Sequence, residues 1–174
     1  MLQDTIRSLP AAVMGLRARP ILRIIEGSQG LVIPACDGRN FLANASGVFK
    51  SFIASDFVGY KFARVGNATK EVAVEIYGQV EDATFAQMFG CISSDLNKLC
   101  FTQHQIEVFC TLYPEFLHMD GACTFFLFKE LGHYSIAQVR VRTNGRSVSL
   151  NSLGLKDIWL AKYAHRVVVP KQTV

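Results

Sequence analysis

Apolar and polar positions alternate most clearly in the last third of the chain. Strict alternation over four to eight residues is typical of a half-buried strand, and a short unbroken apolar run is compatible with a fully buried one. From Cys123 onward the pattern predicts successive strands joined by short turns, a β-meander. Its segments are 123–130, 135–143, 146–153, 158–163 and 165–170.

The dipeptide Asn-Gly at 144–145 is the preferred composition of a two-residue hairpin turn, because both positions of that turn need positive φ. With this turn, Val141 would lie opposite Val148, and Arg140 would lie opposite Ser149. All the partners on the second face are then polar, so a one-residue slip would mix the faces. The sequence therefore predicts a hairpin with an apolar face and a basic, polar face.

Helical patterns occupy the middle of the chain. After an alternating strand at 72–80, we predict helices at 82–92, with Asp82 as N-cap, and at 95–99. A third helix begins at Thr102, because Gln105 stands three residues later and the two side chains can form a capping box. Its apolar residues recur at helical spacing.

The N-terminal part is expected to contribute less to the sheet. Two β-branched segments, 21–27 and 31–38, flank a glycine-containing turn and predict a hairpin, and 46–53 has the spacing of a short helix. Residues 1–19 form a possible arm or short helix, in which Pro10 would end or kink any helix.

These elements define an expected fold. The length of 174 residues suits a single globular domain spanning 1–174. We predict an α+β fold in which an antiparallel sheet, formed largely by the C-terminal meander, packs the middle-region helices on one face.

Composition adds expectations about partners and compartment. Half of the residues are apolar, only 18% are charged, and the mean hydropathy is +0.23, which favours a homo-oligomer that covers part of the apolar surface. No apolar run approaches the roughly 18 residues of a spanning helix, so no membrane partner is expected. The N-terminal charge order is opposite to that of a secretory signal, and the five cysteines lack a paired spacing. We therefore expect a soluble, cytoplasmic protein with free thiols.

The positive charge is concentrated at the C-terminal end. Residues 131–174 carry seven basic side chains against Asp157 alone, whereas the whole chain has a net charge of only +4. A row of basic groups on a sheet face can neutralise phosphates, and Trp159 or Tyr163 could stack on an unpaired base. This pattern predicts nucleic-acid binding without sequence specificity, although a solvated sheet face would look the same. The candidate binding residues are Arg140, Arg142, Arg146, Lys156, Lys162 and Arg166.

An enzyme acting on a small anionic substrate is the alternative. The candidate catalytic residues are His165, Tyr163 and Asp157, with Arg166 as an anion-holding group. In an extended strand, however, His165 and Arg166 point to opposite faces.

A third hypothesis is an oligomeric module that binds a small apolar ligand or a protein partner. The four apolar residues 125–128 must place large groups on both faces of their strand, so both faces need cover. The histidines stand 14, 15 and 32 residues apart, and no glycine fingerprint precedes a helix, so we expect neither a metal nor a cofactor. A non-enzymatic binding protein is the interpretation that the sequence favours.

Three stretches resemble segments of a broad group of uncharacterised bacterial proteins. They are DATFAQMFG (82–90), DGACTFFLFKE (120–130) and HRVVVP (165–170). The resemblance covers mainly the C-terminal half and rests on apolar strand and helix patterns. It implies a bacterial or mobile-element origin and transfers no functional residue.

Overall fold

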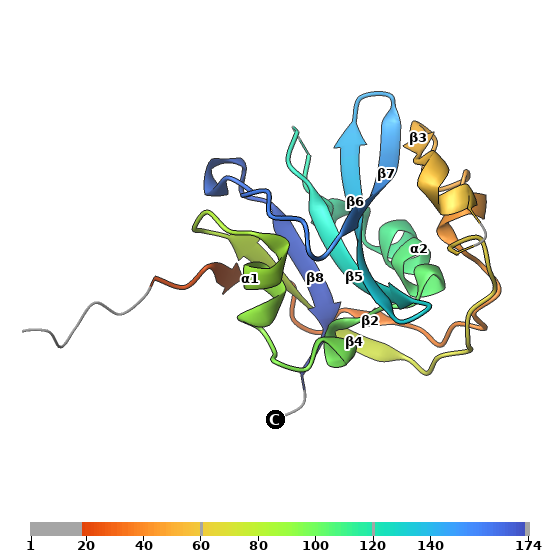
Figure 1. The fold of residues 1–174 in the computed structure, drawn as a ribbon, viewed down its shortest axis with the longest axis horizontal. Helices are drawn as coiled ribbons and strands as arrows, with labels where there is room; N and C mark the ends of the chain where they lie inside the picture. The colour runs from red at the N-terminus through yellow and green to blue at the C-terminus, as the bar shows by residue number, and fades with distance from the viewer. Residues whose placement is uncertain (1–18, 60, 120, 173–174) are drawn as a thin grey trace, which may run out of the picture.

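A computed structural model describes residues 19–59, 61–119 and 121–172. The possible N-terminal arm, 1–19, lies outside the described residues except for Arg19. The described chain forms an eight-stranded sheet with the order β1-β4-β8-β5-β6-β7-β3, and β2 also pairs with β4 (Figure 1). The strands are β1 Leu22–Ile24, β2 Val32–Ile33, β3 Phe52–Ile53, β4 Val72–Gln79, β5 Thr124–Glu130, β6 His133–Arg142, β7 Gly145–Ser152 and β8 Arg166–Pro170.

Two α-helices and several short 3-10 helices join these strands. The α-helices are α1 Phe85–Gly90 and α2 Gln103–Leu112. The 3-10 helices are η1 Leu42–Asn44, η2 Ser55–Val58, η3 Leu96–Leu99, η4 Pro114–Phe116 and η5 Ala161–Tyr163. The α+β class is therefore confirmed.

The sheet is mixed, so the prediction of an antiparallel sheet was wrong. β8 lies between β4 and β5, antiparallel to the first and parallel to the second, and β3 is parallel to β7. The meander thus ends at β7, and the chain crosses the sheet before β8 begins. The reason is burial, since Val167, Val168 and Val169 are all fully buried and a strand that is apolar on both faces belongs at the centre of a sheet.

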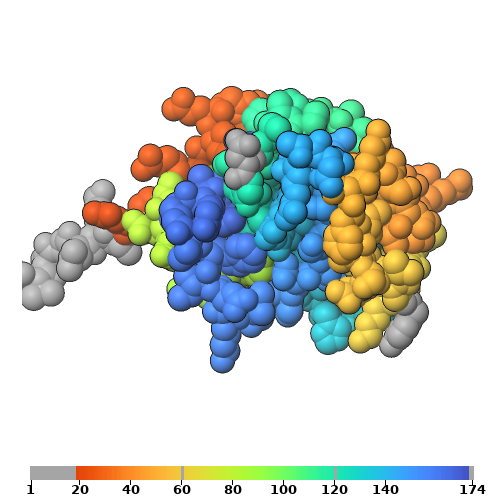
Figure 2. Space-filling model, turned by 90° about the horizontal axis from the view of Figure 1, so that it is seen from above, coloured from red at the N-terminus to blue at the C-terminus, as the bar shows by residue number. Residues whose placement is uncertain are grey.

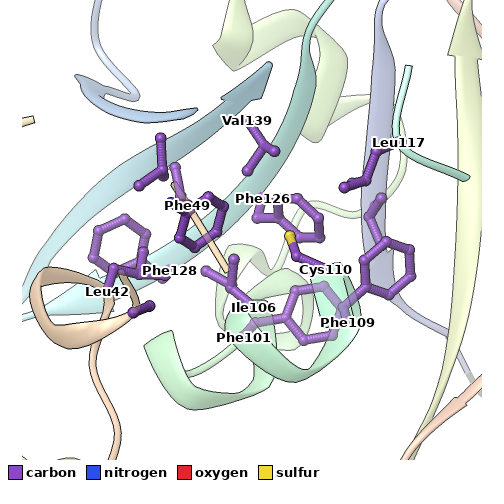
Figure 3. Packing of buried hydrophobic residues seen from close by; sticks show 14 of the residues in the cluster. Leu42, Phe49, Phe101, Ile106, Phe109, Cys110, Leu117, Phe126, Phe128 and Val139 are labelled. Atoms are coloured by element: carbon purple, nitrogen blue, oxygen red, sulfur yellow. The ribbon is translucent and has the colours of Figure 1, made fainter. Parts of the chain in front are cut away.

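The helices cover both faces of the sheet, which corrects the prediction that they pack on one face. Phe126 of β5 contacts Phe109 of α2, with ring centroids 5.3 Å apart. Phe125 points the other way, toward Phe85 of α1, at 4.9 Å. Figure 3 shows the cluster on the α2 side, where Ile106, Phe109 and Phe126 pack together. The apolar run at 125–128 is thus covered on both sides by the chain itself.

The hairpin of β6 and β7 exists, but its register differs from the prediction by two residues. Arg142 pairs with Gly145, so Thr143 and Asn144 form the turn, and Arg140 lies opposite Ser147. Gly145 has φ +118°, a value that favours glycine, and Ser51 Oγ bonds to Asn144 Oδ1 at 3.1 Å. A shift of two residues leaves each side chain on its original face. The basic face was therefore assigned correctly.

The predicted N-terminal elements changed partners. β1 and β2 do not pair with each other. Both pair antiparallel with β4, at different positions along it, and the turn at 25–31 connects them. The predicted helix at 46–53 is replaced by a turn and β3, because the edge of β7 offers backbone hydrogen bonds to residues 51–54. In each case an available strand edge decided the structure.

The predicted middle elements are largely present. β4 matches the expected strand, η3 occupies the second helix, and both bonds of the capping box join Thr102 and Gln105 at the start of α2. The N-cap of α1 is Thr84, two residues after the predicted Asp82. Asp82 instead accepts a hydrogen bond from Ala161 N at 2.7 Å, which ties the segment before β8 to the start of α1.

The central position of β5 predicts a large cost for shortening its side chains. Phe126→Ala should lower the free energy of unfolding by about 4 kcal/mol, because it leaves a cavity in the cluster under α2. Urea titration followed by circular dichroism measures this change. Phe52→Ala is the matched control, since its ring is 54% exposed and its loss should cost about 0.5 kcal/mol or less. Equal effects of the two substitutions would contradict this assignment of the core.

Candidate functional site

Three neighbouring strands bring Cys123, Arg140 and His165 into one row. Thr124 pairs with Val139 of β6 on one side and with Arg166 of β8 on the other. The preceding residue, Cys123, therefore lies between Arg140 and His165, on the sheet face that α1 covers further along. Cys123 N donates to Nδ1 of His165 at 3.0 Å, and Arg140 Nε lies 3.1 Å from Sγ of Cys123.

The segment between β7 and β8 passes beside this row. Trp159 forms a two-way backbone bridge with Ala83, at 2.8 and 3.1 Å, and its carbonyl accepts from Gln79 Nε2 at 2.7 Å. Its ring packs on Phe85 and Phe125 with centroids 5.1 and 4.8 Å apart. In Figure 2 this blue segment lies beside the light-blue hairpin of β6 and β7. Trp159 is thus held in place by contacts with two buried rings of the core.

Arg140, His165 and the segment between β7 and β8 line an open hollow of about 410 Å³, which we call the Arg140 hollow. Its lining residues are Gly121, Arg140, Ile158, Trp159, Leu160, Tyr163 and His165. The volume falls within the range of roughly 300 to 1,000 Å³ that small-molecule sites occupy. A guanidinium, an imidazole and two aromatic rings therefore share one site.

Arg140 is held in place by neutral partners. With its amide oxygen facing the guanidinium, Gln138 accepts from Arg140 Nε at 2.9 Å and from Nη2 at 2.8 Å. Within the described residues, no carboxylate forms an ion pair with Arg140. The positive charge at the floor of the hollow is therefore oriented without being neutralised, and an anionic or acceptor-rich ligand would compensate it.

His165 is buried, with 3% of its surface exposed, and lines the same hollow as Arg140, from which Cys123 separates it. Burial, together with smaller contributions from the nearby His118 and Arg140, lowers its pKa to about 4. The ring is therefore neutral at pH 7, and since Nδ1 accepts from Cys123 N, the proton sits on Nε2. His165 thus offers an N–H donor and no free lone pair on Nε2.

Two further predicted residues lie near the hollow. Arg142 is exposed two positions along β6 from Arg140, so both side chains leave the same face. Lys162 places Nζ 5.0 Å from the ring centroid of Tyr163, which is 49% exposed and packs against His165 at 5.8 Å. Lys162, a candidate for nucleic-acid binding, therefore lies at Tyr163, which the sequence suggested both as a stacking surface and as a catalytic residue.

The remaining candidates are not brought into this site. Arg146 donates to the carbonyl of Cys110, and Arg166 donates to the carbonyl of Phe116 at 2.6 Å. Both leave the sheet on the α2 face, and burial lowers the pKa of Arg166. Lys156 and Asp157 are exposed and do not line the hollow. The proposed pairing of His165 with Arg166 is therefore absent, as their adjacent positions in a strand implied.

Sequence reasoning missed the two residues that orient the site, Cys123 and Gln138. Cys123 was interpreted only as a free thiol, and the structure shows it fully buried. The signal for Gln138 was its place on the polar face of the hairpin, two residues before Arg140. No sequence signal placed Cys123 beside His165, since this contact depends on the parallel pairing of β5 with β8.

No known protein family, curated protein or solved structure matches the chain. The resemblance to an uncharacterised bacterial group therefore stays a hypothesis.

The described residues lack two other features. No helix there is long and apolar enough to span a membrane. Nor do the described residues bring together three or more histidine, cysteine, aspartate or glutamate side chains that could hold a metal ion.

The burial of His165 predicts a pH dependence of stability. In the unfolded chain the imidazole has a pKa near 6.5, whereas in the folded protein it is about 4. Between these values the unfolded state binds a proton that the folded state does not, so stability should be complete above pH 6.5 and fall as the pH drops toward 4.

Thermal unfolding measured across this range checks the prediction. His165→Asn should flatten the fall of Tm, whereas His133→Asn, at an exposed position, should leave it as in the wild type. Identical profiles for all three proteins would show that His165 does not cause the dependence.

Proposed function

We propose that this protein binds single-stranded nucleic acid, without catalysing a reaction, through the Arg140 hollow. The observation that carries the proposal is the meeting of Arg140 with Trp159 and Tyr163 in one hollow of about 410 Å³. Proteins that bind single strands combine basic groups for the backbone with aromatic side chains on which bases stack. Both components are present here, Arg140 on β6 and the two aromatic residues on the segment between β7 and β8.

The distribution of charge supports a polyanionic partner. Arg142 lies two residues beyond Arg140 on the same face of β6, and Lys162 places Nζ 5.0 Å from the ring centroid of Tyr163. Two further cations therefore accompany Arg140 on this side of the molecule. Arg142 and Lys162 are exposed, and a strand that extends beyond the hollow could reach their charged groups. Tyr163 is 49% exposed, so part of its ring is accessible to a base.

The geometry favours binding over catalysis. A general base needs a free lone pair near its substrate, and in His165 the lone pair of Nδ1 already accepts from Cys123 N. The other two catalytic candidates do not supply a substitute, since Asp157 lies outside the lining and Tyr163 is half exposed. An enzyme acting on an anionic substrate remains the alternative hypothesis, now with Arg140 in place of Arg166.

The homo-oligomer also remains a proposal. The two core clusters bury many of the apolar side chains. Ile158 and Leu160, however, are exposed and line the hollow. Contacts between copies through this rim would place two hollows near each other. Light scattering coupled to size exclusion measures the mass of the species in solution.

Salt-dependent binding tests the proposed function. Fluorescence anisotropy of labelled single-stranded DNA and RNA should give a log Kd that rises linearly with log salt concentration. Arg140→Gln and Arg142→Gln should each reduce the slope by about 0.7, the value for one phosphate contact to a single strand. Tyr163→Leu should weaken binding about tenfold by removing a stacking surface.

Arg39→Gln is the matched control, because this arginine is 82% exposed and belongs to the loop after β2. It should change neither slope nor affinity by a comparable amount. Absence of binding to either nucleic acid at low salt would refute the proposal, as would equal effects of Arg39→Gln and Arg140→Gln.

A further inference from the structure

A second open hollow contains two arginines on the α2 face of the sheet, opposite to the face that carries Arg140. Its volume is about 340 Å³, and Arg23, Gly78, His118 and Arg166 are among its lining residues. The strand register explains this grouping, because Gly78 of β4 pairs with Arg23 of β1 on one side and with Arg166 of β8 on the other. Residues paired directly across neighbouring strands point to the same face. We call this feature the Gly78 hollow.

Gly78 leaves the space between the two arginines open. Neighbouring strands lie about 4.8 Å apart, so the Cα atoms of Arg23 and Arg166 are roughly 10 Å apart. Gly78 does not have a positive φ, and the nearest atoms to an added Cβ would be those of the Ile25 side chain, at 3.7 and 3.8 Å. The backbone therefore does not require glycine at this position. A larger residue would fit, and it would fill part of the hollow.

The two guanidinium groups have no counter-charge in the hollow. Arg166 is half-buried, and its Nη1 donates to the carbonyl of Phe116 at 2.6 Å, which orients the group. Among the described residues, no ion pair involves Arg23 or Arg166, and no carboxylate lines the hollow. A charge that is partly removed from water normally has a partner of opposite charge. An anion between the two arginines would compensate both.

The segment after η4 adds His118 to the lining. His118 N donates to Thr124 Oγ1 at 3.1 Å, and its Nδ1 lies 2.6 Å from the carbonyl of Met119. Since a carbonyl can only accept, Nδ1 carries a proton, and Nε2 is left to interact with a ligand. Ile24 and Ile25 line the hollow beside these polar groups. The hollow thus combines cationic groups with an apolar wall.

We infer that the Gly78 hollow binds a small organic oxyanion, a carboxylate or a phosphate monoester, with its charged group between Arg23 and Arg166 and its apolar part against the two isoleucines. Guanidinium groups donate paired hydrogen bonds to both kinds of oxyanion. The volume also falls within the range of roughly 300 to 1,000 Å³ that small-molecule sites occupy. This site shares no lining residue with the Arg140 hollow, so it goes beyond the proposed function.

Isothermal titration calorimetry with the wild-type protein tests the inference. Phenyl phosphate and benzoate represent the two kinds of oxyanion, and phenol is the uncharged control of similar shape. In a phosphate-free buffer of low salt, at least one of the two anions should bind with a Kd of about 1 mM, the affinity expected for so small a ligand. Phenol should not bind.

Two substitutions test the place of binding. Arg23→Gln should weaken binding about tenfold, because a charge-assisted hydrogen bond is lost. Gly78→Val should weaken it at least as much by filling the hollow, while Tm should not fall, since valine suits a strand and its Cβ would make ordinary contacts. Arg39→Gln is the matched control, because Arg39 is exposed and does not line the hollow, and it should leave the affinity unchanged.

Three outcomes would overturn the inference. The first is the absence of binding by both anions at roughly 10 mM, tenfold above the expected Kd. The second is an affinity that neither Arg23→Gln nor Gly78→Val changes, or that is equal for phenol and the anions. The third is loss of binding in Arg140→Gln without an effect of Arg23→Gln, which would place the anion in the Arg140 hollow. Nucleic-acid binding is measured separately by anisotropy, so the proposed function does not depend on this result.

Discussion

The placement of β8 between β4 and β5 is the constraint on which the rest of the structure depends. Its valines are buried on both faces, so β8 can only lie inside the sheet, and its parallel pairing with β5 requires a crossover from β7. The crossover segment contains Trp159 and Tyr163. The same requirement that buries β8 therefore delivers the aromatic residues to the sheet face beside Arg140.

Apolar cover on both faces explains how a chain with few charges hides its large side chains. The run at 125–128 sends Phe125 toward α1 and Phe126 toward α2, and each ring has an aromatic partner on a different helix. The apolar cluster on the face toward α1 includes Phe125 and Ile136, and the polar residues Gln138 and Arg140 follow Ile136 on the same face of β6. Gln138 is buried there, whereas the half-buried Arg140 lines the hollow.

The site shows how neutral partners can orient a charge without cancelling it. Gln138 and Cys123 contact the guanidinium of Arg140, and within the described residues no carboxylate pairs with it. The backbone of Cys123 also fixes the tautomer of His165. A guanidinium that is already held in one orientation loses little conformational entropy on binding, so it suits recognition of a ligand that offers acceptors.

The sequence by itself determined the local features: the strand at β4, the capping box of α2, the C-terminal hairpin and the polar face that contains Arg140. Each depends on neighbours within a few residues, through side-chain alternation or a cap. Only the tertiary structure decided the partners of β1, β2 and β3, the insertion of β8 and the meeting of His165 with Arg140. These depend on which strand edges are free and which faces can be covered, and residues far apart in the sequence settle both.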